Sequence, residues 1–271
     1  MKLSIPFNWR NDFLESIPRD SVSSIYGRLH LDAAGSGSGS VLAFDGSRKE
    51  MAEYVAKINK SGYRFNYIFD GTCCDNLEWT RKWQENVRCF LDWLVKTQVS
   101  SITISIPYLA EIIKKCYHTL GVEVSHCAQV DTLLRAKRWN DLGVDVITLA
   151  PDAVSGNFEL IMSIKKALRC QLQLVANEFY LSQSTSYSAY SNRSSHLTQE
   201  FNQIGSHRML RKEGQMNLMF GDNDINQHIW IKPDEVAAYE EVGIERIKLF
   251  ENSLNTDAIF KMIGSYLSLA N

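Results

Sequence analysis

Polar and ionisable side chains follow apolar, strand-like runs at several points along this sequence. They include carboxylates, an imidazole and an ammonium group, which are the groups that perform general acid–base catalysis in enzymes. The members of this set are Asn8, Tyr26, Arg28, Asp70, His126, Gln129, Asp152, Asn177, Glu178, Lys248 and Glu251. Polar residues in such places also cap helices, and we expect Asp152 to be an N-cap of this kind.

A long polar segment, 178–228, separates the seventh apolar run from the last one. It begins with a serine-rich stretch and continues with Arg193-Ser-Ser-His196. Loops of this length inside a compact domain are uncommon, and they are usually either functional or disordered. We therefore expect 178–228 to be a lid-like loop that brings Arg193 and His196 over the site.

Strand-like and helix-like segments alternate eight times along the chain. The expected strands are Lys2–Pro6, Ser24–Gly27, Phe65–Asp70, Ile102–Ile106, Val122–His126, Asp145–Ala150, Leu172–Ala176 and Arg246–Phe250. Eight such units in 271 residues predict an α/β protein, a single TIM-like (β/α)8 barrel over residues 1–271 with a long loop after strand seven. A doubly wound open sheet is the alternative, but no GxGxxG motif follows a strand. In a barrel, the candidate residues meet at the C-terminal ends of the strands, where active sites lie.

Two further patterns predict how the elements pack. A long helix from about Asn76 to Lys96 carries Trp79 and Trp83 on a stripe that predicts a core face. The run from Gly35 to Ser40 lacks bulky side chains, so it must be a flexible turn or a close approach of two backbone segments.

The composition excludes several classes of partner. A net charge of −2 provides no field that would favour nucleic acid or anionic lipid. No uninterrupted apolar window reaches about 18 residues, so a membrane span is not expected. The first residues are too few and too polar for a signal peptide, which predicts a cytoplasmic protein.

The metal-binding potential of the sequence is low. Six cysteines occur without any CxxC pair, and we expect free thiols rather than a zinc site. His126, Glu178, Asp70 and His196 are residue types that ligate metals. No HxH or HExxH spacing supports a site made of them, and we predict no metal.

A nucleophilic residue is harder to select. Cys127 is adjacent to His126, but neighbours in a strand point to opposite faces, which argues against a Cys–His pair. Cys73 and Cys74 follow a strand end and are the better thiol candidates. No GxSxG elbow marks a serine nucleophile.

Short fragments spread over nearly the whole chain resemble peptidase family U-32, the collagenase-like peptidases. The fragments keep the order and spacing of the family. They are Ile25-Tyr-Gly27 with Asp32, Phe65-Asn-Tyr67, Pro107-Tyr-Leu109, Val124-Ser125 with Ala128-Gln-Val130, Asn177-Glu178 with Arg193 and His196, and Ile231-Lys-Pro-Asp-Glu235. The resemblance implies a TIM-type barrel, in agreement with the count of strand–helix units.

The resemblance also implies two kinds of chemistry. Some members are described as peptidases or collagenases, and others carry a 4Fe–4S cluster on four cysteines for oxygen-independent hydroxylation of RNA or quinone precursors. Where the family has its first two cluster cysteines, this chain has Tyr180 and Tyr190, and no cysteine follows Cys170. Because such a cluster needs thiolate or occasionally His ligands, we expect no iron–sulfur cofactor.

We therefore expect a cluster-free U-32 peptidase-like enzyme, a pathway-specific tailoring hydrolase acting on a peptide or peptide-like substrate. Glu178 is the expected general acid or base, with Asp70 as its partner and His196 delivered by the lid. Arg193 and Lys248 are expected to hold an anionic group of the substrate. The other substrate-binding candidates are His126, Tyr26, Asn177 and Asp152.

Two alternatives stay open. The first is a non-catalytic accessory or binding subunit of a U-32 heteromer, because lost cysteines resemble degeneration of a catalytic partner. The second, which is less favoured, is an oxygen-independent hydroxylation protein. The expected partners are thus a peptide or small-molecule substrate and a homologous subunit, with neither nucleic acid nor membrane.

Overall fold

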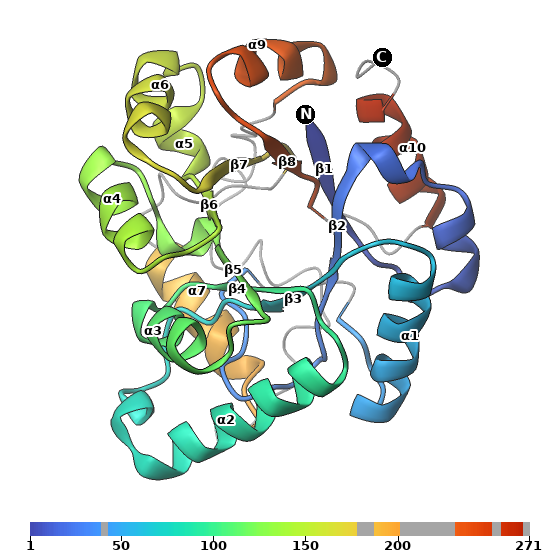
Figure 1. Cartoon of the computed structure of the whole chain (residues 1–271), viewed down its shortest axis with the longest axis vertical. Coiled ribbons are helices and arrows are strands. Elements are labelled where there is room, and N and C mark those ends of the chain that lie inside the picture. Colours follow the sequence, from blue (N-terminus) through green and yellow to red (C-terminus); the bar gives the residue numbers. More distant parts are fainter. Residues whose placement is uncertain (39–42, 178–186, 201–230, 251–255, 268–271) are drawn as a thin grey trace.

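Eight parallel strands close into a barrel in the order in which they occur along the chain, and β1 pairs with β8 to complete it (Figure 1). This arrangement comes from a computed structural model, which describes residues 1–38, 43–177, 187–200, 231–250 and 256–267. The strands are β1 (Lys2–Pro6), β2 (Val22–Gly27), β3 (Phe65–Phe69), β4 (Ser101–Ile104), β5 (Gly121–Val124), β6 (Val146–Thr148), β7 (Gln171–Val175) and β8 (Arg246–Lys248). The predicted TIM-like (β/α)8 barrel is confirmed.

Helices surround the barrel as an outer ring (Figure 1). They are α1 (Arg48–Lys60), α2 (Arg81–Lys96), α3 (Pro107–Cys116), α4 (Leu133–Asp141), α5 (Pro151–Val154), α6 (Phe158–Ala167), α9 (Val236–Glu241) and α10 (Thr256–Leu267). Short 3-10 turns join them: η1 (Asn11–Glu15), η2 (Arg19–Ser21), η3 (Leu77–Trp79), η4 (His126–Ala128) and η6 (Pro233–Glu235). None of the helices in these described ranges is both long and apolar enough to span a membrane.

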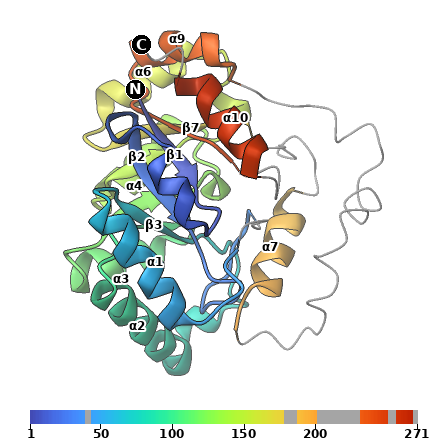
Figure 2. The ribbon, with the colours of Figure 1, turned by 90° about the vertical axis from the view of Figure 1, so that its right-hand side faces the viewer.

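One helix, α7 (Tyr187–Leu197), lies outside the ring, at one end of the barrel (Figure 2). It falls inside the segment 178–228 that was predicted to be loop, so the loop prediction is wrong for these eleven residues. Apolar side chains in this segment do not gather on one helical face, and its serine-rich composition is typical of loops. Contacts with the barrel, described below, stabilise the helix in place of intrinsic propensity.

The strands present apolar side chains outward to the helices and polar side chains into the barrel. Ile5, Ile25 and Ile104 are fully buried in the outer layer. Inside, Arg246 of β8 donates a hydrogen bond to Glu123 of β5 at 3.1 Å. Because these strands are not neighbours, the bond must cross the lumen. The interior thus differs from the Val-, Ile- and Leu-filled centre typical of this fold.

The long helix predicted over 76–96 begins later than expected. Asn76 adopts a left-handed backbone (φ 60°), and the hydroxyl of Thr80 caps α2 by accepting from the amide of Trp83. Trp83 is buried as predicted, but Trp79 precedes the cap and is 68% exposed, so its assignment to the core is wrong. The indole of Trp79 packs instead against Tyr108, with ring centroids 5.1 Å apart.

The glycine run makes the close backbone approach that was one of its two predicted roles. Gly35 has a φ of +75°, and its carbonyl accepts from the amide of Gly71 at 3.0 Å. The Gly37 amide donates to the carbonyl of Asp70 at 3.1 Å. A Cβ on Gly71 would lie 2.0 Å from the Ala34 carbonyl oxygen. Two glycines therefore let the segment after β2 lie directly on the end of β3.

Candidate active site at the C-terminal mouth of the barrel

Asp70 lies at the C-terminal end of β3 and is completely buried. Its Oδ1 accepts from the Ser36 hydroxyl at 2.7 Å, and its Oδ2 accepts from Ser125 at 2.8 Å and Ser38 at 3.2 Å. These donors come from the glycine run and from the residue after β5. Because both carboxylate oxygens are engaged, Asp70 fixes the walls of the mouth, and the structure gives it a positioning role beside its predicted role as catalytic partner.

A cysteine and a histidine meet in the turn that directly follows Ser125, one of the donors to this carboxylate. The Sγ atom of Cys127 lies 3.4 Å from Nε2 of His126, and both side chains are buried. The strand β5 ends at Val124, and the two residues belong to the single turn η4, where neighbouring side chains need not point to opposite faces. The argument that excluded a Cys–His pair assumed that the strand reached His126, and it is wrong for that reason.

The turn that carries this pair is tied to Asp70. The hydroxyl of Ser125 donates to the Asp70 carboxylate and accepts from the amide of Cys127 at 3.2 Å. The ring of His126 also packs edge-on against Phe250, with centroids 6.4 Å apart. Nucleophilic catalysis requires a nucleophile and a base within hydrogen-bond reach of each other. Cys127 and His126 meet this requirement, and Ser125 and Asp70 anchor the backbone of their turn.

Lys248 lies inside the barrel at the end of β8. It is 4% exposed, and its ammonium lies 4.5 Å from the centre of the Tyr26 ring. Tyr26 donates its hydroxyl to the carbonyl of Leu249 at 2.7 Å. The hydroxyl of Tyr26 is thereby engaged with backbone, and its ring face holds the lysine by a cation–π interaction. A cation at this position favours an anionic group that enters the mouth.

The structure also places two other predicted site residues, Asn177 and Asp152. Asn177 donates to the carbonyl of Phe250 at 2.9 Å and accepts from its amide at 2.6 Å, which joins the ends of β7 and β8. Asp152 lies in the first turn of α5 rather than at its N-cap, which is Ala150, so the capping prediction is wrong. The Pro at the first position of α5 starts the helix without a side-chain cap.

The helix α7 is held against the loop that follows β3. The amide of Thr72 donates to the Ser195 hydroxyl, and the Thr72 hydroxyl donates to Asn192, both at 2.8 Å. Gln199, just after the helix, donates to the carbonyls of Cys73 at 2.7 Å and Ala34 at 2.9 Å. These bonds satisfy buried polar groups on both sides, so α7 is a fixed cover on the β3 side of the mouth.

The cover carries the two predicted lid residues. His196 lies with its Nε2 3.3 Å from Oδ1 of Asp75, and Arg193 is half-buried on the same helix. His196 thus contacts the loop after β3 through Asp75. Asp70, the residue with which it was predicted to act, is instead held by hydrogen bonds from serines. Glu178, the predicted acid or base, lies outside the described residues.

A buried ion pair beneath this cover contains Arg28, one of the candidates at the strand ends, and Asp32. Arg28 and Asp32 are both fully buried, with Nη2 3.1 Å from Oδ2. Asp32 also accepts from the Tyr67 hydroxyl at 2.9 Å and from the amide of Gly35 at 2.6 Å. Burial raises the pKa of Tyr67 well above its ordinary value. Asp32 pairs through its backbone with Gln199, so this network supports both the glycine run and α7.

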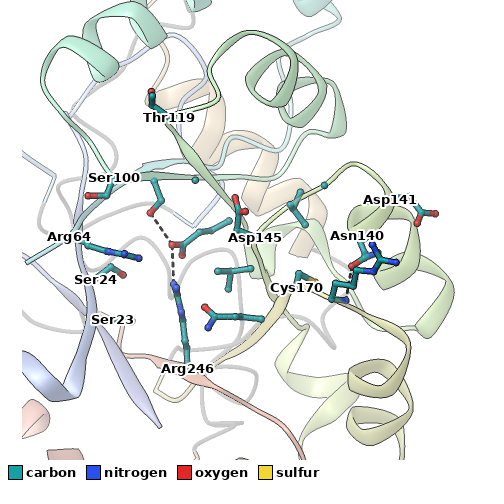
Figure 3. A pocket seen from close by; sticks show the side chains of 18 of the residues that line it. Ser23, Ser24, Arg64, Ser100, Thr119, Asn140, Asp141, Asp145, Cys170 and Arg246 are labelled. Carbon is teal, nitrogen blue, oxygen red and sulfur yellow. Dashed lines mark hydrogen bonds and ion pairs between the residues drawn. The ribbon is translucent and has the colours of Figure 1, made fainter.

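A hollow lies at the opposite end of the barrel. It has a volume of about 1200 Å³ and is lined by residues at or near the strand starts, among them Arg64, Ser101, Glu123, Asp145 and Arg246 (Figure 3). Two of its charged groups are paired with each other, since Glu123 accepts from Arg246, and Glu123 also accepts from the Ser101 hydroxyl. Active sites in this fold lie at the C-terminal face, so we place the candidate site at the mouth and not in this hollow.

Among the described residues, one group has the composition of a metal site. The ligand atoms of Cys73, Asp75 and His196 all lie within 4.8 Å of one another. The set weighed from the sequence, which contained Asp70 and His126, does not form such a group in the described part of the chain. The residues present do not fit the 4Fe–4S cluster of the family, because all six cysteines are described and the converging group contains one thiol.

Comparisons with known proteins agree with this fold and extend it. No family model matches the chain. An uncharacterized protease of Methanocaldococcus jannaschii, MJ1657, is 28% identical over 142 residues, which are 52% of this chain and 42% of the relative. The match thus spans less than half of that relative.

Solved structures show the fold. The U32 peptidase Mk0906 superimposes with a TM-score of 0.72 at 21% identity, covering 93% of this chain and 94% of that one. The tryptophan synthase alpha-subunit of Pyrococcus furiosus reaches a TM-score of 0.55 at 10% identity, covering 98% of each chain. The chain is a (β/α)8-barrel protein. The likeness to the U32 peptidase structure, which at 21% identity shows the fold, agrees with the resemblance to peptidase family U-32 seen in the sequence.

Proposed function

We propose that this protein is a cluster-free U-32-like hydrolase that cleaves an amide bond of a peptide or peptide-like substrate at the C-terminal mouth. The observation that carries the proposal is the 3.4 Å contact between Cys127 Sγ and His126 Nε2 in the turn that follows Ser125. A thiol within reach of an imidazole provides an activated nucleophile at neutral pH. The relative named a protease and the U32 peptidase support a peptide bond as the target.

The reaction follows from the pair. His126 accepts the thiol proton of Cys127, and the sulfur attacks the carbonyl carbon of the substrate. The C–N bond breaks, and the amine leaves with the proton held by His126, which produces a thioester on Cys127. Water then attacks the thioester while His126 removes its proton, so that the acid is released and the thiol is restored.

Other residues at the mouth supply binding. Lys248, buried against the ring of Tyr26, is placed to attract a carboxylate of the substrate. Arg193, on the cover helix α7, is proposed to bind an anionic group of the same substrate. Glu178 was predicted from the sequence as a general acid or base. In this proposal it assists departure of the amine.

The test uses purified protein and a mixture of proteome-derived peptides, with newly formed termini read by mass spectrometry. We expect cleavage by the parent, a loss of roughly 10³-fold or more in Cys127→Ala, and unchanged cleavage in Cys89→Ala, which alters an exposed thiol on α2. No cleavage by the parent contradicts the hydrolase. Cleavage that persists in Cys127→Ala but disappears in Glu178→Gln assigns the chemistry to Glu178 and overturns the role of Cys127.

A further inference from the structure

We propose that Cys73, Asp75 and His196 bind a zinc-type transition metal ion, and that the ion fastens α7 to the barrel. The three ligand atoms come from two parts of the chain, the loop after β3 and the cover helix α7, and they converge within 4.8 Å. This inference goes beyond the proposed hydrolysis and does not depend on it. It departs from the sequence-based prediction of no metal, because the spacing along the chain does not show this convergence.

The distances suit a tetrahedral ion. Two nitrogen or oxygen ligands, each about 2.0–2.2 Å from zinc, lie roughly 3.4 Å apart in a tetrahedral site. The Nε2 atom of His196 and Oδ1 of Asp75 are 3.3 Å apart, so this edge of the tetrahedron is already formed. The sulfur of Cys73 needs to move inward by about 1 Å at most, since a thiolate lies about 2.3 Å from zinc.

The backbone holds the ligands in this arrangement. Asp75 has a φ of 54°, a left-handed conformation that a non-glycine residue adopts at some cost. Gln199 fixes the carbonyl of Cys73 at 2.7 Å, and Thr72 bonds to Ser195 one residue before His196. Both ligand-bearing segments are therefore positioned by bonds that do not involve the ligand atoms. Strained backbone is concentrated at functional sites, and here it lies at a ligand.

The ligand types select the ion. A thiolate, an imidazole and a carboxylate suit Zn²⁺ or Co²⁺, whereas Mg²⁺ and Ca²⁺ prefer oxygen ligands alone. Asp75 is 59% exposed at its side chain and His196 is 14% exposed, so an ion reaches the site from solvent. Three protein ligands leave a fourth position for water or a substrate group.

The consequence concerns the cover of the mouth. His196 is the residue through which α7 would join the ion, and Cys73 and Asp75 lie on the barrel side. A bound ion would add three coordination bonds to the hydrogen bonds of Thr72 and Gln199 that already hold α7. The helix would then be more tightly closed in the metal-loaded protein than in the metal-free protein.

The first measurement is a Co²⁺ titration of the metal-free protein, followed by competition with Zn²⁺. We expect one equivalent to bind, with the near-ultraviolet absorption of a thiolate–cobalt bond, and Zn²⁺ to displace it. In Cys73→Ser this absorption should vanish. His196→Gln removes a ligand, so it should weaken Co²⁺ binding by more than the roughly 10–100-fold that results when a residue hydrogen-bonded to a ligand is lost. Cys89→Ser is the matched control and should bind like the parent. Absence of the absorption in the parent, or its persistence in Cys73→Ser, overturns the site.

The second measurement is amide hydrogen exchange of α7 with and without Zn²⁺. We expect Zn²⁺ to slow exchange across Tyr187–Leu197 in the parent and in Cys89→Ser, and to leave Cys73→Ser unchanged. Asp75→Asn is a control for misfolding, because it keeps the size of the side chain and removes the carboxylate ligand. Its exchange without Zn²⁺ should match that of the parent. Binding of Zn²⁺ with unchanged exchange in α7 overturns the fastening of the cover while leaving the metal site in place.

Discussion

The sulfur of Cys127 lies 3.4 Å from Nε2 of His126, inside the single turn that follows β5. The two side chains converge because η4 replaces the last residues of the strand, and Ser125 ties this turn to the carboxylate of Asp70. The relationship has a chemical consequence that is independent of any substrate. A thiol next to an imidazole loses its proton at a lower pH than an isolated thiol does.

The first prediction concerns alkylation of the thiols. Iodoacetamide should modify Cys127 with a rate that persists below pH 7, and the exposed thiol of Cys89 provides the comparison. Peptide mapping by mass spectrometry at several pH values from about 5 to 9, which includes the pH range where activated thiols ionise, gives both rates in one sample. In His126→Ala the rate at Cys127 should acquire the pH dependence of Cys89. Identical profiles for the two thiols in the parent would contradict the pairing.

The second prediction concerns the ion pair across the lumen. Glu123→Ala should lower the free energy of unfolding by about 3–5 kcal/mol, because it leaves the Arg246 guanidinium largely buried without its partner. The control is Glu85→Ala, which removes an exposed pair with Arg81 and should change stability by less than about 1 kcal/mol. Urea unfolding followed by circular dichroism measures both. Equal, small effects would show that the lumen is hydrated enough to replace the partner.

The third prediction concerns alkaline pH. Burial raises the pKa of Tyr67, and also those of Tyr117 and Tyr266 to about 12. An unfolded tyrosine ionises near pH 10, so above that pH the unfolded chain releases protons that the folded chain keeps. Stability is therefore fully present below about pH 10 and falls as the pH rises through the folded pKa values.

This dependence is measured by urea unfolding at several pH values from about 8 to 11, around the unfolded tyrosine pKa. Tyr67→Phe should lose about 1 kcal/mol at neutral pH, through its hydrogen bond to Asp32, and should show a shallower loss at alkaline pH than the parent. A parent whose stability rises between these pH values would contradict the assignment.

The fourth prediction concerns the glycine that admits the segment after β2. Gly71→Ala should destabilise the protein by more than about 1 kcal/mol, because the new Cβ would lie 2.0 Å from the Ala34 carbonyl and neither backbone can easily move. Gly264→Ala is the control in α10, where no atom lies within 4 Å of the new Cβ, and it should stabilise by about 0.5–1 kcal/mol. Thermal unfolding of both variants gives the comparison. A neutral Gly71→Ala would mean that the close approach is not required.

The number, order and direction of the barrel elements follow from local pattern. The apolar, fully buried run of strands such as Phe65–Phe69 and the helical period in α2 depend on neighbours within a few residues, so the sequence predicts them. Asp70 and Lys248 were placed at the mouth by the same reasoning, since parallel strands end together. Errors occurred where one residue alters a local boundary, as at Trp79 before the Thr80 cap and at His126 beyond the end of β5.

What the sequence by itself determined is thus the closed barrel and the edge at which its polar residues gather, because both depend on short-range periodicity. Only the tertiary structure decided which of those residues meet. Glu123 contacts Arg246 because the barrel closes, and Cys73 and Asp75 meet His196 because α7 folds back across the mouth. These pairings are separated by about a hundred residues or more, and their geometry depends on packing that no local pattern encodes.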